Sequence, residues 1–288
     1  MRALIVVLLL CLAVPAAGQE EGSHRTEHLV LQWAPGDLSQ EGVAYAEELG
    51  ERLYAAIAEM LGSEPKFPVT IVFEGPAERP DGSRGYPRVD GWGRIRLYNF
   101  GPTHHSYFSA LAHEMVHVFR IHRRPHHDWF FEEGFAEFVA RRVDDNLNGF
   151  PWYGFDPALV AGQWVDSGED LPLADLRDRH EELSLPCKLQ SYALRYSFFD
   201  FLGRTFGDDQ VVAMSAADEA GAREDYPDYF GTGFAELEEA WRKDLVVRYA
   251  EIEAREELAH QYRNESPAQY QPVCADEPAV RQASPGVD

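Results

Sequence analysis

Cysteine is scarce in this chain of 288 residues, which contains three, and the two in the body of the chain lack the spacing of metal ligands. Basic residues are also few, since 26 lysines and arginines stand against 49 aspartates and glutamates, for a net charge of −23. Such an acidic surface argues against nucleic acid and anionic membranes as partners, and it favours cationic ones. Beyond the N-terminal segment, no apolar run approaches the roughly 20 residues that a membrane-spanning helix needs.

Residues 1–18 have the three parts of a secretory signal peptide. Arg2 supplies the positive charge, an apolar run extends from Ala3 to Val14, and residues 16–18 are the small residues that signal peptidase accepts. The apolar run is too short to cross a bilayer as a membrane anchor. We therefore expect cleavage near residue 18 and export to a periplasm or to the cell exterior, with no stable membrane anchor afterwards.

Two cysteines remain after this cleavage, Cys187 and Cys274. In an oxidising compartment they can form a disulfide that ties the C-terminal tail to the rest of the domain. The alternative is a pair of free thiols.

The first third of the chain carries the strand patterns. We expect strands over 28–35 and 67–75, with an amphipathic helix over 42–61 between them. The segment 76–93 is dense in glycine and proline and predicts a loop. Residues 94–101 alternate between apolar and polar side chains, which predicts an edge strand.

The remainder of the chain has only helical patterns. We expect a helix over 129–143 that Asp128 caps, a loop-rich stretch with short helices over 144–185, and an apolar helix over 191–206. The segment 234–262 predicts one long helix. A small strand-bearing part followed by helices is an α+β fold, in which the strands pack on the helix that carries the motif described next.

The stretch HEMVH, residues 113–117, places two histidines and a glutamate close together. Positions four apart share a helix face, so His113 and His117 can bind one metal ion. Glu114 lies about 100° around the helix from His113, where it can reach a water on that ion without binding the ion itself. This is the HExxH pattern, with two zinc ligands and a general base. The alternative is a helix whose histidines have other partners.

The segment WFFEEGFAEF offers the third ligand. A catalytic zinc ion has three protein ligands and an open position for water. Glu133 and Glu137 lie four apart among phenylalanines that predict a buried helix, and buried carboxylates need a partner. We assign Glu133 as the third ligand, and Glu137 as the acceptor that orients a ligand histidine through its outer nitrogen. Glu132 competes for the ligand role, and a solvated acidic face is the alternative for Glu133 and Glu137.

HEMVH followed by WFFEEGFAEF resembles the gluzincin metallopeptidases, in particular the peptidase MA-like proteins related to aminopeptidase N and, more distantly, to thermolysin. In those families the glutamate before the glycine of EGxAE is the third zinc ligand, which corresponds to Glu133. The resemblance implies a peptidase MA-like catalytic domain over residues 27–250. Residues 251–288 then form a helical extension and an unstructured tail.

The resemblance also implies a hydrogen-bond donor for the oxyanion. In aminopeptidase N relatives a tyrosine at a comparable SY helix start has this role, which corresponds to Tyr192. One such donor can contribute about 3 kcal/mol in the transition state. Tyr192 can instead be a core residue, and Tyr196, one turn later, is the second candidate.

The activity implied is that of an exported Zn²⁺-dependent hydrolase that cleaves peptide bonds in a peptide or protein substrate. Glu114 is then the general base and a zinc-bound water the nucleophile. The segment GRIRLYNFG has no acid to bind a free substrate amine, as aminopeptidases of the family do, so we expect an endopeptidase. Two alternatives stay open, a catalytically silent zinc-containing binding or scaffold protein and a hydrolase of non-peptide amides.

Overall fold

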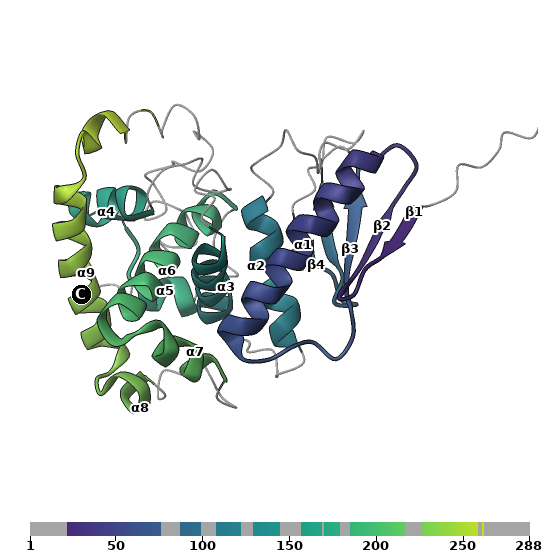
Figure 1. Cartoon of the computed structure of the whole chain (residues 1–288). Coiled ribbons are helices and arrows are strands. Elements are labelled where there is room, and N and C mark those ends of the chain that lie inside the picture. The colour runs from purple at the N-terminus through teal and green to yellow at the C-terminus, as the bar shows by residue number, and fades with distance from the viewer. Residues whose placement is uncertain are drawn as a thin grey trace, which may run out of the picture.

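The part of the chain that the computed structural model describes comprises residues 22–75, 87–98, 108–121, 129–144, 157–168, 170–178, 185–216, 226–258 and 261. It contains a five-stranded sheet at one side and an array of helices at the other (Figure 1). This mixed, mostly helical structure is compatible with the α+β class expected from the sequence.

The strands form a single sheet in the order β1-β2-β3-β5-β4. Their bounds are β1 Gly22–Arg25, β2 Leu29–Trp33, β3 Val69–Glu74, β4 Arg88–Val89 and β5 Ile95–Tyr98. β2, β3 and β5 are parallel, whereas β1 and β4 pair antiparallel at the two edges. In β3 the alternate side chains of Val69, Ile71 and Phe73 are buried, as expected for a strand with one face against helices.

Two expectations about the sheet were wrong. The strand inside 94–101 is not an edge strand, because β4 pairs with β5 on the side opposite β3. β4 itself lies in the segment 76–93 that we expected to be loop, since two residues are too few to show any periodicity. β1 was also not predicted, and it precedes residue 27, where we expected the domain to begin.

α1, Gln40–Leu61, confirms the helix expected over 42–61 and packs on the sheet. It begins at a cap, because the hydroxyl of Ser39 accepts a hydrogen bond of 3.0 Å from the backbone N–H of Gly42. It ends at Gly62, whose φ of 60° is the left-handed conformation that glycine adopts most readily.

The other helices have the following bounds: α2 Phe108–Ile121, α3 Trp129–Val143, α4 Pro157–Ser167, α5 Leu173–Asp178, α6 Leu185–Phe206, α7 Asp208–Ala216, α8 Tyr226–Phe230 and α9 Phe234–Glu251. α2 lies between the sheet and α3, and α3 packs in turn against α6 (Figure 1). The helix over 129–143 is confirmed, and the helix over 191–206 extends further back to Leu185. Within the described ranges, no helix is both long and apolar enough to cross a membrane.

The C-terminal helix is shorter than expected. α9 ends at Glu251, so the segment 234–262 is not one continuous helix. Ile252 is extended and Ala254 has a φ of 53°, which breaks the helical backbone before a further short helical segment over 255–258. The i to i+4 charge pattern continues through this point and therefore did not reveal the break.

Several expectations fall on residues that the structure does not describe. Asp128, the expected cap of α3, is one of them, as are residues 1–18 of the expected signal peptide. Cys274, the side chain of Cys187 and all of residues 262–288 also lie outside the described residues.

α3 is buried on all sides, and its contact with α6 is close. A Cβ atom at position 134 would lie 2.6 Å from the ring of Phe199, so only glycine permits this approach. Aromatic side chains fill the surrounding core, namely Phe130, Phe131, Phe135, Phe198, Phe199 and Trp241. A helix so enclosed holds its buried carboxylates, those of Glu133 and Glu137 among them, in fixed directions.

Candidate metal centre

α2 and α3 bring three side chains together as the sequence predicted. The Nε2 atoms of His113 and His117 lie 3.1 Å apart. Oε2 of Glu133 lies 3.1 Å from the Nε2 of His113, and Oε1 of Glu133 lies 3.6 Å from the Nε2 of His117. Among the described residues these three form a group whose ligand atoms all lie within 4.8 Å of one another. This group can hold a metal ion.

The separations fit a small tetrahedral cation. Ligand atoms bound to zinc at about 2.1 Å in tetrahedral geometry lie about 3.4 Å from each other. The observed values of 3.1, 3.1 and 3.6 Å lie on both sides of that distance. Two imidazole nitrogens and one carboxylate oxygen are also the donor types that zinc prefers at catalytic sites.

The fourth partner, Glu137, determines how His113 is oriented. Its Oε2 lies 3.1 Å from the Nδ1 of His113, and because an ionised carboxylate only accepts, Nδ1 donates this hydrogen bond. The Nε2 of His113 is thus left to face both His117 and Glu133. A single proton can join only two of these three groups, whereas one metal ion satisfies all three. Glu137 therefore lies against the outer nitrogen of His113, as the sequence analysis expected.

The carboxylates and imidazoles at the centre shift each other's pKa values in the directions that favour their charged forms. Burial by itself raises the pKa of the Glu133 carboxyl, but the imidazoles of His117 and His113 hold that pKa well below its ordinary value. Burial lowers the pKa of His113, but the adjacent Glu133 and Glu137 carboxylates raise it well above its ordinary value. Glu133 is consequently ionised, in the form that binds a cation.

Glu132, the competing candidate, is engaged elsewhere. Its carboxylate accepts two hydrogen bonds from Arg120 of α2, from Nε at 3.0 Å and from Nη2 at 2.8 Å. This pairing turns it away from the group formed by His113, His117 and Glu133. Of the two glutamates, Glu133 is therefore the one that lies in the group able to hold a metal ion.

Glu114 is buried next to this group. Burial raises the pKa of its carboxyl, the imidazoles of His113 and His117 lower it, and the Glu133 carboxylate raises it again, with the pKa above its ordinary value as the net result. The backbone N–H of Val89, in strand β4, donates a hydrogen bond to the same carboxylate. A carboxylate with a raised pKa is a stronger proton acceptor than an ordinary one.

Tyr192 of α6 also faces the centre, while Tyr196 does not. The ring of Tyr192 lies 5.9 Å from the ring of His113, edge to face, and its phenol donates a hydrogen bond to Glu133. Burial and the Glu133 carboxylate raise the pKa of this phenol well above its ordinary value, so it remains a protonated donor. Tyr196 packs instead near Arg141, whose guanidinium carbon lies 6.0 Å from the centre of its ring.

Three contributors to this region were not predicted from the sequence. Arg120 donates hydrogen bonds to Glu132. The Nε of Arg141 lies 3.4 Å from Oε1 of Glu137. The backbone N–H of Val89 donates a hydrogen bond to Glu114. For Arg141 a signal was present, because it follows Glu137 by four positions on the same helix face. Neither of the other two contacts has a counterpart in local sequence spacing.

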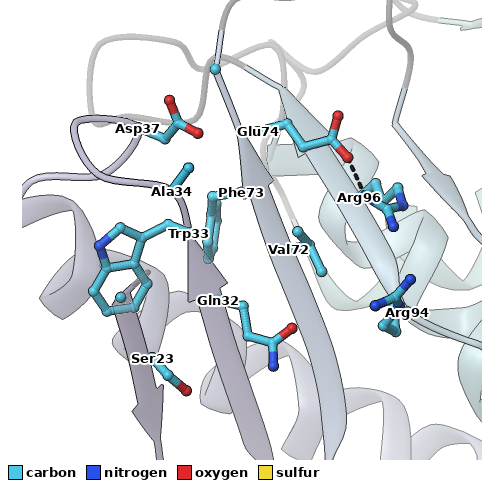
Figure 2. A pocket seen from close by; sticks show the side chains of 12 residues that line it. Ser23, Gln32, Trp33, Ala34, Asp37, Val72, Phe73, Glu74, Arg94 and Arg96 are labelled. Atoms are coloured by element: carbon cyan, nitrogen blue, oxygen red, sulfur yellow. Dashed lines mark hydrogen bonds and ion pairs between the residues drawn. The ribbon is translucent and has the colours of Figure 1, made fainter. Parts of the chain in front are cut away.

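A separate pocket of about 610 Å³ lies at the sheet and contains none of the predicted site residues. Figure 2 shows Trp33, Glu74, Arg94 and Arg96 among the side chains around it. Arg96 is paired with Glu74, and Arg94 donates a hydrogen bond of 2.9 Å from Nε to Asp90. Both arginines that line this pocket are thus paired with carboxylates of the chain.

A scan against protein-family models finds no match to this chain, and a search of curated proteins finds no significant match. The functional assignment therefore depends on the geometry of the site and on the motifs that carry it.

Proposed function

We propose that the protein is a zinc-dependent hydrolase that cleaves peptide bonds, of the gluzincin type and close to the peptidase MA-like proteins. The observation that carries the proposal is the convergence of His113, His117 and Glu133 from two packed helices at separations that suit one tetrahedral cation. Glu114 and Tyr192 stand beside this group, as base and donor.

The three ligands would hold a zinc ion, which would lower the pKa of a bound water and polarise the substrate carbonyl. The chain's own residues supply the remaining functions. Glu114 accepts a proton from the attacking water and returns it to the leaving amine, and its raised pKa suits both transfers. Glu137 keeps the ring of His113 in place through Nδ1.

Tyr192 supplies the donor for the oxyanion. Its phenol points at Glu133, a ligand of the proposed zinc, so it lies close to where charge develops on the substrate oxygen. A phenol has one O–H, so Tyr192 would pass its hydrogen bond from Glu133 to the substrate oxygen as charge develops there.

An extended peptide fits the edge of the sheet. β4 is the edge strand of the described sheet on the side of β5. The hydrogen bond from Val89 of β4 to Glu114 brings this edge to the general base. A substrate that lies along β4 would thus present a peptide bond beside Glu114.

We favour endopeptidase over exopeptidase action. β5 carries no acidic residue, and Asp90, which follows β4, is paired with Arg94 and Arg96. Neither offers a free carboxylate for a substrate amine. The expected signal peptide over 1–18 supports export, and the acidic composition favours cationic segments in the substrate.

The deciding experiment is digestion of an unbiased peptide library with the purified mature chain, read by mass spectrometry. We expect internal cleavages that phenanthroline abolishes. The variant Glu114→Gln should keep one zinc ion per chain and lose at least about 100-fold in rate. A wild-type protein that binds zinc and cleaves nothing would instead indicate the silent scaffold.

A further inference from the structure

The hydrogen bond between His113 and Glu137 continues to a third side chain, that of Arg141. Oε2 of Glu137 lies 3.1 Å from the Nδ1 of His113, while Oε1 lies 3.4 Å from the Nε of Arg141. Glu137 thus stands between an imidazole and a guanidinium. All three side chains are buried, with 3%, 9% and 7% of their surface exposed for Glu137, Arg141 and His113.

This arrangement has a physical consequence for Glu137. A carboxylate so deeply buried ionises only next to positive charge, and a guanidinium stays charged at any ordinary pH. Arg141 approaches one oxygen of the carboxylate, which leaves the other oxygen directed at His113. An ionised acceptor makes a stronger hydrogen bond to the imidazole N–H than a neutral one, and this raises the basicity of the opposite nitrogen.

We propose that Arg141 is a positioning residue of the metal centre, which acts through Glu137 on His113 and strengthens metal binding without touching the metal. This inference rests on the proposed zinc site but not on turnover. It adds a residue that the HExxH and EGxAE motifs do not contain.

Arg141 also packs near the ring of Tyr196, so a purely structural role has to be separated from the proposed one. The test is a double-mutant cycle on the zinc affinity of the mature chain, measured by competition with a chromophoric chelator. Glu137→Gln should weaken zinc binding about 10- to 100-fold. Arg141→Gln should weaken it about 3- to 10-fold, the value of one hydrogen bond.

The double variant identifies the route. If Arg141 acts through Glu137, then Arg141→Gln added to Glu137→Gln causes no further loss of zinc affinity. If Arg141→Gln weakens zinc binding as much in the Glu137→Gln background as in the wild type, Arg141 does not act through Glu137. Arg141→Lys should fall between wild type and Arg141→Gln, because the ammonium retains the charge but not the Nε–H.

Arg142 is the matched control, since it is the next residue on α3 and pairs with Asp208 and Asp200 instead. Arg142→Gln should lower the unfolding temperature and leave the zinc affinity unchanged. If Arg141→Gln does not fold, Arg141→Lys replaces it, and weaker zinc binding than wild type supports the inference.

The two proposals fail differently. If the wild-type chain binds no zinc, the proposed function is wrong. A wild-type chain that binds zinc, with Arg141 variants that bind it equally tightly, overturns this inference alone.

Discussion

Arg120 of α2 and Glu132 of α3 form a bidentate ion pair, with Nε–Oε2 at 3.0 Å and Nη2–Oε1 at 2.8 Å. The remaining nitrogen of Arg120, Nη1, donates to the backbone oxygen of Ser215 in α7 at 2.9 Å. One buried guanidinium thus joins three helices. The two adjacent glutamates on α3 therefore have different partners. Glu132 pairs with the arginine that links the helices, and Glu133 faces His113 and His117.

This division predicts opposite results for two variants that differ by one position. Glu133→Gln should lose stoichiometric zinc, because an amide replaces an anionic ligand, and should remain folded. Glu132→Gln should keep its zinc but lose about 3 kcal/mol of unfolding free energy, since a buried guanidinium loses its anion. Zinc content after dialysis and urea unfolding give the two readouts. Loss of zinc from Glu132→Gln with full retention in Glu133→Gln would reverse the assignment.

Removing the phenol at position 192 should affect turnover and not metal content. Tyr192→Phe keeps the ring near His113 but removes the oxyanion donor, so kcat should fall about 100-fold while the zinc stoichiometry stays the same. Tyr196→Phe, one turn further along α6, is the control and should change kcat by less than about threefold. Steady-state kinetics on a peptide found in the library digestion would measure both. Equal losses in the two variants would assign Tyr192 to the core.

The β4–β5 turn should make stability depend on pH. Burial raises the pKa of Asp90, but hydrogen bonds from the side chain and backbone of Arg94 and from the backbone of Trp92 outweigh it and lower the pKa to about 2. A lowered pKa stabilises the folded state at pH values above the unfolded pKa near 4. That stabilisation disappears as the pH falls from about 4 to about 2.

The variant Asp90→Asn should therefore lose about 1 kcal/mol at neutral pH, a value reduced by solvent screening of the pair. Its loss relative to wild type should shrink as the pH approaches 2. Urea unfolding at several pH values between 2 and 7 checks this trend. A constant difference across that range would show that the charge of Asp90 contributes nothing.

The close contact between α3 and α6 should tolerate no side chain at position 134. Gly134→Ala would place a Cβ 2.6 Å from the ring of Phe199, and we expect a loss of about 1–3 kcal/mol even though alanine favours helix. Gly91→Ala is the matched control, because no atom lies within 4 Å of its added Cβ. Thermal unfolding of both variants would test this, and an equally stable Gly134→Ala would show that α3 and α6 can separate freely.

Much of the metal centre could be predicted because it depends on local periodicity. Residues four apart share a helix face in any tertiary setting, so the pairings of His113 with His117 and of Glu133 with Glu137 follow from spacing alone. Helix α3 was predicted with its correct bounds, Trp129–Val143. The two-residue strand β4 and the end of α9 carry no such pattern.

The sequence by itself determined which residue types share a face on α2 and on α3, and it limited the candidates for a third metal ligand to two neighbouring glutamates. Adjacent helical positions point about 100° apart, so only the rotation at which α3 docks on α2 decided between Glu132 and Glu133. Tertiary packing also decided that Val89 lies beside Glu114 and that Tyr192, rather than Tyr196, lies near His113. Such contacts join segments far apart in the chain, and their geometry exists only once the sheet and helices have packed.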